Sequence, residues 1–278
     1  MLDRVWAIES TSFDPRLELT TWRTPKAIGP SKTANDGLAV VAISGTLLKG
    51  ASRYDFRDST CLGSIELELL RLASDESIDR VLVVVDSPGG SVAGLESAAS
   101  AYATLAKAKP TFAYVSGMAC SACYWLIAPS TKIWAARSSV IGSIGTVLCI
   151  ADSSKLFEQG GVKIHKISST SLKGGSEPGV EITPEVLDDF QRIVDSINSL
   201  FIEAVQSGRR MSDAAVQAVS TGSVWLGQEA KALGLIDCVG ELSDCLFALN
   251  ERHGSKQPPR PPQSDDDHFP TRSKYTER

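Results

Sequence analysis

The sequence predicts an α/β fold in which mostly parallel sheets are flanked by helices. Two apolar, β-branched segments are typical of buried strands, residues 38–47 (LAVVAISGTL) and residues 80–86 (RVLVVVD). Each is followed by a segment with helical spacing of small or apolar residues, over residues 64–74 and residues 95–107. Because strands that are apolar throughout alternate with helices, we expect both faces of the sheet to be covered.

The alternation continues through the rest of the chain. A third strand is expected at residues 111–115, and a helix is expected to begin near Ser121. Further strands are predicted at residues 132–136, 145–150 and 162–167, and further helices at residues 153–159 and 183–206. Thr183 is expected to cap the last of these helices and Pro184 to occupy its first turn, positions that both residue types favour.

Composition divides the chain into three parts. Residues 1–36 are polar and rich in turn residues, so we expect an N-terminal arm, and residues 37–253 contain the apolar segments of the main domain. Residues 254–278 combine proline and charge with few apolar side chains. Such a segment cannot offset the entropy of ordering, so this tail is predicted to be disordered.

Charge and hydropathy exclude several classes of protein. The net charge of −5 and the pI of about 5.3 argue against nucleic acid as a partner, because phosphate binding needs a basic face. The N-terminus lacks the apolar run of a secretory signal. Nor does any stretch of about 18 consecutive apolar residues occur. We therefore expect a cytoplasmic protein with no integral membrane segment.

The cysteine pattern favours free thiols over disulfides or a metal site. Six cysteines are present, and a cytoplasmic protein is expected to keep them reduced. Cys120 and Cys123 form a CxxC, but no second pair supplies the four ligands of a closed zinc site. We expect neither a metal nor an organic cofactor.

Histidine is scarce where a hydrolase would need it. Of three histidines, His253 and His268 lie beyond the expected core, and His165 lies in a short expected strand, where a structural role is the commoner one. A Ser-His-Asp triad therefore finds little support. If the chain is a hydrolase, it needs another general base.

Glycine- and serine-rich turns follow several expected strands. In SPGG at residues 87–90, glycine leaves backbone amides accessible to negative charge. Ser121 lies among small residues where a strand passes into a helix, which suits a nucleophile and a helix cap equally well. GSIG follows at residues 142–145, and Lys173 lies in a glycine-rich loop further on. Each motif alone also fits an ordinary turn or a solvated lysine.

Taken together and in this order, the four motifs resemble those of the S49 peptidases. That family includes bacterial signal peptide peptidases and the head-maturation proteases of tailed phages. The resemblance covers approximately residues 38–249. It implies a ClpP/crotonase-like fold and a serine endopeptidase that acts on a polypeptide substrate through a Ser-Lys dyad.

The resemblance also implies a role for individual residues. Ser121 falls on the nucleophile, Lys173 on the general base and Ser143 on the serine that orients the lysine. Gly90 falls on the oxyanion-hole glycine, with the backbone amide of Ala122 as the second donor. A lysine amine acts as a base only when neutral, and burial favours the neutral form, so the site is expected to be enclosed.

Departures from the family pattern bear on specificity and role. Family members commonly carry glycines where this chain has Ala122 and Cys123, which bears on the shape of the pocket. We expect no membrane anchor of the signal-peptide branch, which favours the phage-type branch. That branch processes capsid or scaffold proteins, including within a phage prohead. Three alternatives stay open: SppA-like degradation of signal peptides or other small peptides, a non-catalytic assembly or scaffolding protein of the same fold, and crotonase-like chemistry on acyl-CoA.

The longest predicted helix indicates self-association. It carries apolar residues on more faces than one domain core readily covers: Ile193, Ile197, Leu200, Phe201 and Val205. Contiguous exposed apolar patches commonly mark interfaces. Related enzymes enclose their active sites in rings, so we expect a homo-oligomer larger than a dimer.

Overall fold

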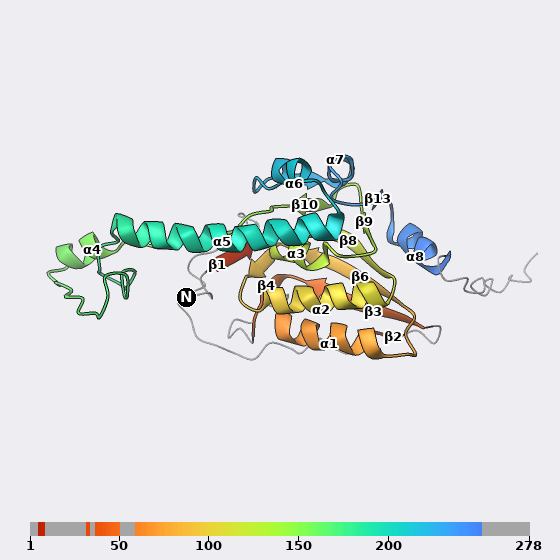
Figure 1. Cartoon of the computed structure of the whole chain (residues 1–278), viewed down its shortest axis with the longest axis horizontal. Helices are drawn as coiled ribbons and strands as arrows, with labels where there is room; N and C mark the ends of the chain where they lie inside the picture. The colour runs from red at the N-terminus through yellow and green to blue at the C-terminus, as the bar shows by residue number, and fades with distance from the viewer. Residues whose placement is uncertain (1–4, 9–31, 34–36, 51–58, 252–278) are drawn as a thin grey trace, which may run out of the picture.

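The computed structural model describes residues 5–8, 32–33, 37–50 and 59–251 (Figure 1). The predicted disordered tail, residues 254–278, lies outside the described residues, as does most of the predicted N-terminal arm. His253 and His268 lie outside them as well.

The larger sheet is mostly parallel, as the sequence predicts. Its order is β12-β10-β8-β6-β3-β2, and β9 pairs with both β8 and β13. Pairing is parallel from β3 through β6 and β8 to β10, whereas β2 and β12 are antiparallel at the two edges. The strands are β2 (Lys32–Thr33), β3 (Leu38–Ser44), β6 (Arg80–Ser87), β8 (Thr111–Cys120), β9 (Lys132–Ala135), β10 (Val140–Gly142), β12 (Val224–Leu226) and β13 (Cys238–Val239).

A smaller sheet lies beside the larger one, with the order β11-β1-β7-β4-β5. Its strands are β1 (Val5–Ile8), β4 (Thr46–Leu48), β5 (Ser59–Cys61), β7 (Gly89–Ser91) and β11 (Val147–Leu148). Both β1 and β2 fall within the polar N-terminal arm, where the sequence predicts no strand. β1 (VWAI) is apolar but only four residues long, and β2 is a pair of polar residues, so neither forms the longer run that predicts a strand.

Helices cover both faces of the larger sheet. On one face, α1 (Leu62–Ser74) and α2 (Leu95–Ala108) pack over a core that includes Val83 of β6. On the other, α8 (Leu242–Glu251) packs against Leu82 of the same strand. Neighbouring residues of one strand point to opposite faces, so a strand covered on both sides is apolar throughout.

The longest helix, α5 (Pro184–Arg209), extends beyond the body of the molecule (Figure 1). It begins as predicted, because the side chain of Thr183 accepts a hydrogen bond from the amide of Val186. Its C-terminal half packs on α3 (Ala122–Ile127) and α6 (Asp213–Val219), and α7 (Gly227–Ala232) follows. We call residues 150–190, which include α4 (Ser154–Gln159) and the first turns of α5, the projection.

Two sequence predictions about this region are wrong. Residues 162–167, predicted as a strand, have no regular structure and are exposed, since no strand lies beside them to supply hydrogen bonds. The apolar residues of the long helix, predicted to exceed what one core covers, are also largely buried in the core of the same chain. Ile197, Phe201 and Val205 are covered by neighbouring helices, and the Phe201 ring stacks on Trp125 at a centroid distance of 5.0 Å.

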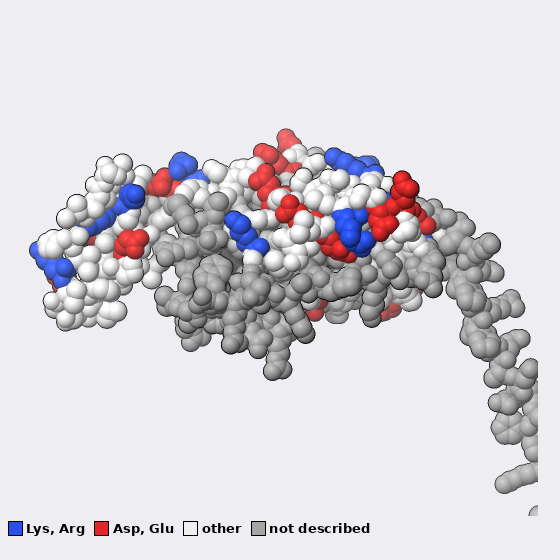
Figure 2. Space-filling model, turned by 90° about the horizontal axis from the view of Figure 1, so that it is seen from below, with Lys and Arg blue, Asp and Glu red and all other residues white. Residues whose placement is uncertain are grey.

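The structure also shows the state of the thiols and the distribution of surface charge. All six cysteines are free. In the part of the chain that the structure describes, no helix is long and apolar enough to cross a membrane. Among the described residues on the face shown in Figure 2, acidic and basic side chains are interspersed.

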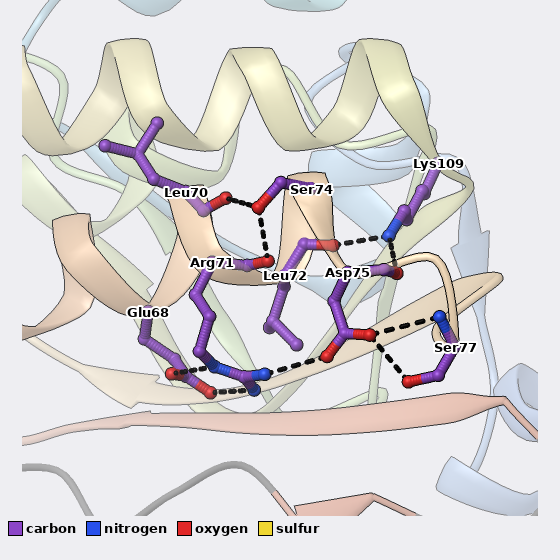
Figure 3. A network of polar contacts seen from close by, with 8 residues as sticks. All are labelled: Glu68, Leu70, Arg71, Leu72, Ser74, Asp75, Ser77 and Lys109. Atoms are coloured by element: carbon purple, nitrogen blue, oxygen red, sulfur yellow. Dashed lines mark hydrogen bonds and ion pairs between the residues drawn. The ribbon is translucent and has the colours of Figure 1, made fainter.

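A polar network closes the C-terminal end of α1 (Figure 3). The last carbonyls of a helix lack intrahelical partners. Lys109, which follows α2, donates from Nζ to the carbonyl of Leu72 at 2.5 Å and to that of Asp75 at 2.6 Å. The carboxylate of Asp75 in turn accepts hydrogen bonds from Arg71 and Ser77. The network therefore ties α1 to the end of α2.

Replacing Lys109 by Met should lower the free energy of unfolding by about 1–3 kcal/mol, because two helix-end carbonyls lose a charged donor. Lys107→Met, two residues away on the exposed side of α2, is the matched control and should change stability little. Chemical denaturation followed by circular dichroism measures both. Equal stability of the two variants would contradict the assigned role of Lys109.

Candidate active site

The site is built where two parallel strands of the larger sheet end together. The last paired residues of β8 and β10 are Cys120 and Gly142. The residue that follows each strand is a serine with a positive φ: 53° at Ser121 and 52° at Ser143. Because the strands are parallel and in register, their ends place both serines at the same edge of the sheet.

Ser121 occupies a sharp turn between β8 and α3. Its φ of 53° and ψ of −124° lie outside the regions that L-residues favour, at a cost of about 1–3 kcal/mol. Hydrogen bonds hold the turn: the Ser121 amide donates to the Gly142 carbonyl at 2.8 Å, and the Trp125 amide donates to the Ser121 carbonyl at 3.0 Å. A strained strand-to-helix turn is how hydrolases present a nucleophilic serine.

The hydroxyl of Ser121 is only weakly engaged. Its Oγ donates to the carbonyl of Gly145 over a long 3.5 Å, and the side chain is buried. A weakly held hydroxyl gives up its proton to a base more readily than one in a short hydrogen bond. This environment therefore suits a nucleophilic serine whose proton is taken by a general base from elsewhere.

The loop after β10 is fixed around Ser121. The Ser143 amide donates to the Ser223 carbonyl at 2.7 Å, and the Thr146 hydroxyl donates to the Val194 carbonyl of α5 at 3.0 Å. The Ser143 hydroxyl makes no hydrogen bond with the described residues and is thus open to another partner. Gly142 must be glycine, because φ is +122° and a Cβ would lie 2.7 Å from the Trp225 ring.

Gly90 lies close to this turn, though in a different setting from the one predicted. The sequence places SPGG directly before a helix, whereas Gly90 lies within strand β7, and α2 begins only at Leu95. Strand β7 packs on α3, the helix that follows Ser121. A Cβ at Gly90 would lie 2.0 Å from the Leu47 carbonyl oxygen, so no side chain fits there.

The two candidate bases, Lys173 and His165, lie away from Ser121 of the same chain. Lys173 is exposed in the projection, whereas Ser121 is buried at the start of α3, the helix on which the C-terminal half of α5 packs. The lysine Nζ makes no hydrogen bond with the described residues. His165 is exposed on the projection too. One chain therefore brings together Ser121, Ser143 and Gly90 but does not provide the enclosed lysine that the sequence predicts.

Cys123 is a poor rival to Ser121 as nucleophile. Burial raises the pKa of its thiol, and this effect outweighs the hydrogen bond with Ser87 that lowers it. The thiolate is the reactive form of cysteine, so a thiol that stays protonated is inert near neutral pH.

Sequence reasoning missed two residues that shape the site. Asp86 lies where the register between β6 and β8 shifts, and its carboxylate accepts a hydrogen bond from the Met118 amide at 3.0 Å. Thr146 links the loop after β10 to α5. Both directly flank recognised motifs, SPGG and GSIG, and that position is the signal that could have found them.

Comparison with known proteins agrees with this geometry. A sequence model described as "Peptidase family S49" matches residues 103–256. The chain belongs to peptidase family S49. A Clp protease model matches residues 57–139, in keeping with parallel strands flanked by helices, so the predicted ClpP/crotonase-like α/β fold is confirmed.

Relatives of this S49 chain include proteases from archaea, bacteria and phages. A putative protease of Methanocaldococcus jannaschii, MJ0651, is 32% identical over 65% of this chain and 58% of its own length. Capsid assembly protease C of Escherichia phage lambda is 29% identical over 78% of this chain and 49% of its own length. A putative signal peptide peptidase SppA of Enterococcus faecium is 28% identical over 78% and 64%. The chain thus spans about half the length of the first two relatives.

Gly90→Ala should reduce the labelling rate of Ser121 by a fluorophosphonate probe about a hundredfold, the effect of losing one oxyanion donor. The added methyl would push β7 off Leu47, as the 2.0 Å approach shows. Gly63→Ala in α1 is the control, since its Cβ would make only an ordinary 3.7 Å contact. Unchanged labelling of Gly90→Ala, with native circular dichroism, would remove Gly90 from the site.

Proposed function

We propose that the protein is a serine endopeptidase whose nucleophile is Ser121 and whose general base is Lys173. The observation that carries the proposal is the strained, buried serine turn beside the Gly90 strand in a member of a protease family. In this mechanism the Ser121 Oγ attacks the scissile carbonyl while the lysine amine takes its proton. The lysine then returns that proton to the leaving amine, and water hydrolyses the acyl-enzyme.

The developing oxyanion would be held by backbone amides. Gly90 supplies one donor, and Ala122 supplies the other as the first residue of α3, whose amide has no partner inside the helix. Each such donor is worth about 3–4 kcal/mol in comparable sites. The free hydroxyl of Ser143 is the group proposed to hold the lysine amine in position.

We infer that the lysine reaches the serine from a second copy of the chain. Lys173 is exposed on the projection, away from Ser121 of its own chain. A lysine becomes neutral near pH 7 only when it is desolvated, so some surface has to cover it. Docking of the projection onto a neighbouring copy would bury Lys173 and deliver it to a serine in one step.

The surface of the projection supports this self-association. It exposes the apolar residues Leu156, Val162, Ile164, Ile167, Leu172 and Leu187. Ile167 is 96% exposed, and several exposed apolar side chains within one segment commonly mark an interface. These residues replace the buried face of α5 as the proposed interface of a homo-oligomer larger than a dimer.

For the biological role, we propose the phage-type processing of capsid or scaffold proteins in a cytoplasm or prohead. Similarity to capsid assembly protease C over most of this chain favours it. SppA-like degradation of small peptides is the second candidate, favoured by the similarity to a putative signal peptide peptidase. Portal and capsid genes beside the coding sequence would distinguish the first from the second. A non-catalytic assembly protein would leave Ser121 unreactive.

Ser121→Ala and Lys173→Ala should each abolish hydrolysis of a fluorogenic peptide, since the two residues act as one unit. Coexpressed in equal amounts, the two inactive variants should regain about a quarter of wild-type activity, because one site in four pairs an intact serine with an intact lysine across a ring interface. A dyad within one chain would give no recovery at all.

His165→Ala is the matched control, because it lies on the same exposed projection as Lys173. It should keep full activity alone. Light scattering must show the same assembly mass for all three variants. Loss of activity in His165→Ala together with an active Lys173→Ala would replace the lysine by a histidine base.

The rate should rise with pH from neutral toward alkaline values, because a lysine accepts a proton only in its neutral form. Initial rates at saturating peptide between pH 5 and 10 measure the profile. An optimum near pH 5 with loss above pH 7 would contradict a lysine base.

A further inference from the structure

Strand β1 occupies an unusual place in the smaller sheet. It pairs antiparallel with β7, where Ala7 is the partner of Gly90, and antiparallel with β11, where Trp6 is the partner of Val147. Among the described strands it is the only link between β7 and β11. The sheet is continuous at this point only because an N-terminal segment lies in it.

Each neighbour of β1 belongs to the candidate active site. Strand β7 carries Gly90, the proposed oxyanion donor. Strand β11 follows directly on the loop that holds Ser143 and Gly145. Helix α3, which begins after Ser121, also packs on β1. The backbone of residues 5–8 therefore runs between the oxyanion strand and the loop that holds the nucleophile.

Removal of β1 would leave a slot one strand wide. Neighbouring strands lie about 4.8 Å apart, so β7 and β11 would be separated by about 10 Å with unpaired backbone groups on both sides. An extended peptide fills such a slot by strand addition, with hydrogen bonds to each edge. In this structure the edge of β7 beside Gly90 is filled by the chain itself.

We propose that the N-terminal strand Val5–Ile8 is an internal occupant of the peptide-binding slot between β7 and β11 and competes there with substrate. The inference rests on the proposed function. While Ala7 is the partner of Gly90, no other peptide can pair with that residue. Because the occupant belongs to the same chain, its competition does not depend on protein concentration. A substrate gains access by displacing it.

Ala7→Pro in the full chain tests the proposal, because proline disrupts strand pairing. A slot that is open one tenth of the time raises the apparent KM about tenfold, so the variant should show a KM about tenfold lower with kcat unchanged. Hydrogen exchange at the amides of β7 should speed up in the same variant. Thr33→Pro is the matched control, since β2 pairs at the opposite edge of the larger sheet.

A capped peptide of residues 5–8 gives a second, independent readout. It should inhibit the wild-type protein competitively, and the same peptide with proline at the position of Ala7 should not. Cleavage within residues 5–8 of the wild-type chain, absent from Ser121→Ala, would also support occupancy of the slot. The peptide test decides the matter if Ala7→Pro does not fold.

The outcomes separate this inference from the proposed function. If the wild-type protein is active but has the same KM and the same β7 hydrogen exchange as Ala7→Pro, the proposal that residues 5–8 occupy the slot is wrong. The proposed peptidase function is then unaffected. If neither protein hydrolyses peptides or takes a fluorophosphonate probe, the peptidase proposal fails. In that case, hydrogen exchange at the amides of β7 is the measurement that decides whether residues 5–8 occupy the slot.

Discussion

The parallel pairing of β8 with β10 is the constraint on which the rest of the site depends. The pairing ends at Cys120 and Gly142, and each of the two strands is followed by a turn at a serine with a positive φ. The amide of Ser121 is held by the carbonyl of Gly142, so the strain at one strand end is supported by the other. Interactions that keep these strands in register, including the packing on both faces of the larger sheet, thereby hold the Ser121 turn in place.

Helix α5 separates Lys173 from Ser121, two residues that the sequence analysis assigns to one site. With 26 residues it is about 39 Å long, and its hydrogen bond from Thr146 fixes it to the loop beside Ser121. The projection with Lys173 lies at the far end. Lys173 precedes this helix, among the exposed residues of the projection. Under the proposed Ser-Lys mechanism the lysine would come from another copy, so assembly would complete the site as well as enclose it.

The two proposals would each place a control on activity. In the first, the base comes from a neighbouring copy, and in the second, the peptide slot opens when residues 5–8 leave β7 and β11. Both rest on elements that contribute little to the central core, a projecting helix end and a four-residue strand. In a peptidase, such controls would act before any substrate side chain is recognised.

The sequence by itself determined the parallel sheet, the helices on both of its faces and the positions of the motifs, because apolar periodicity and glycine punctuation are local properties. It also predicted the strand-to-helix turn at Ser121 and the cap at Thr183. It could not show that Phe201 and Val205 are buried in their own core while Lys173 is exposed, since burial depends on which elements meet in space. Nor could the four-residue run VWAI reveal β1 as a central strand of the smaller sheet, because its partners Gly90 and Val147 lie far along the chain. Only the tertiary structure decided these points.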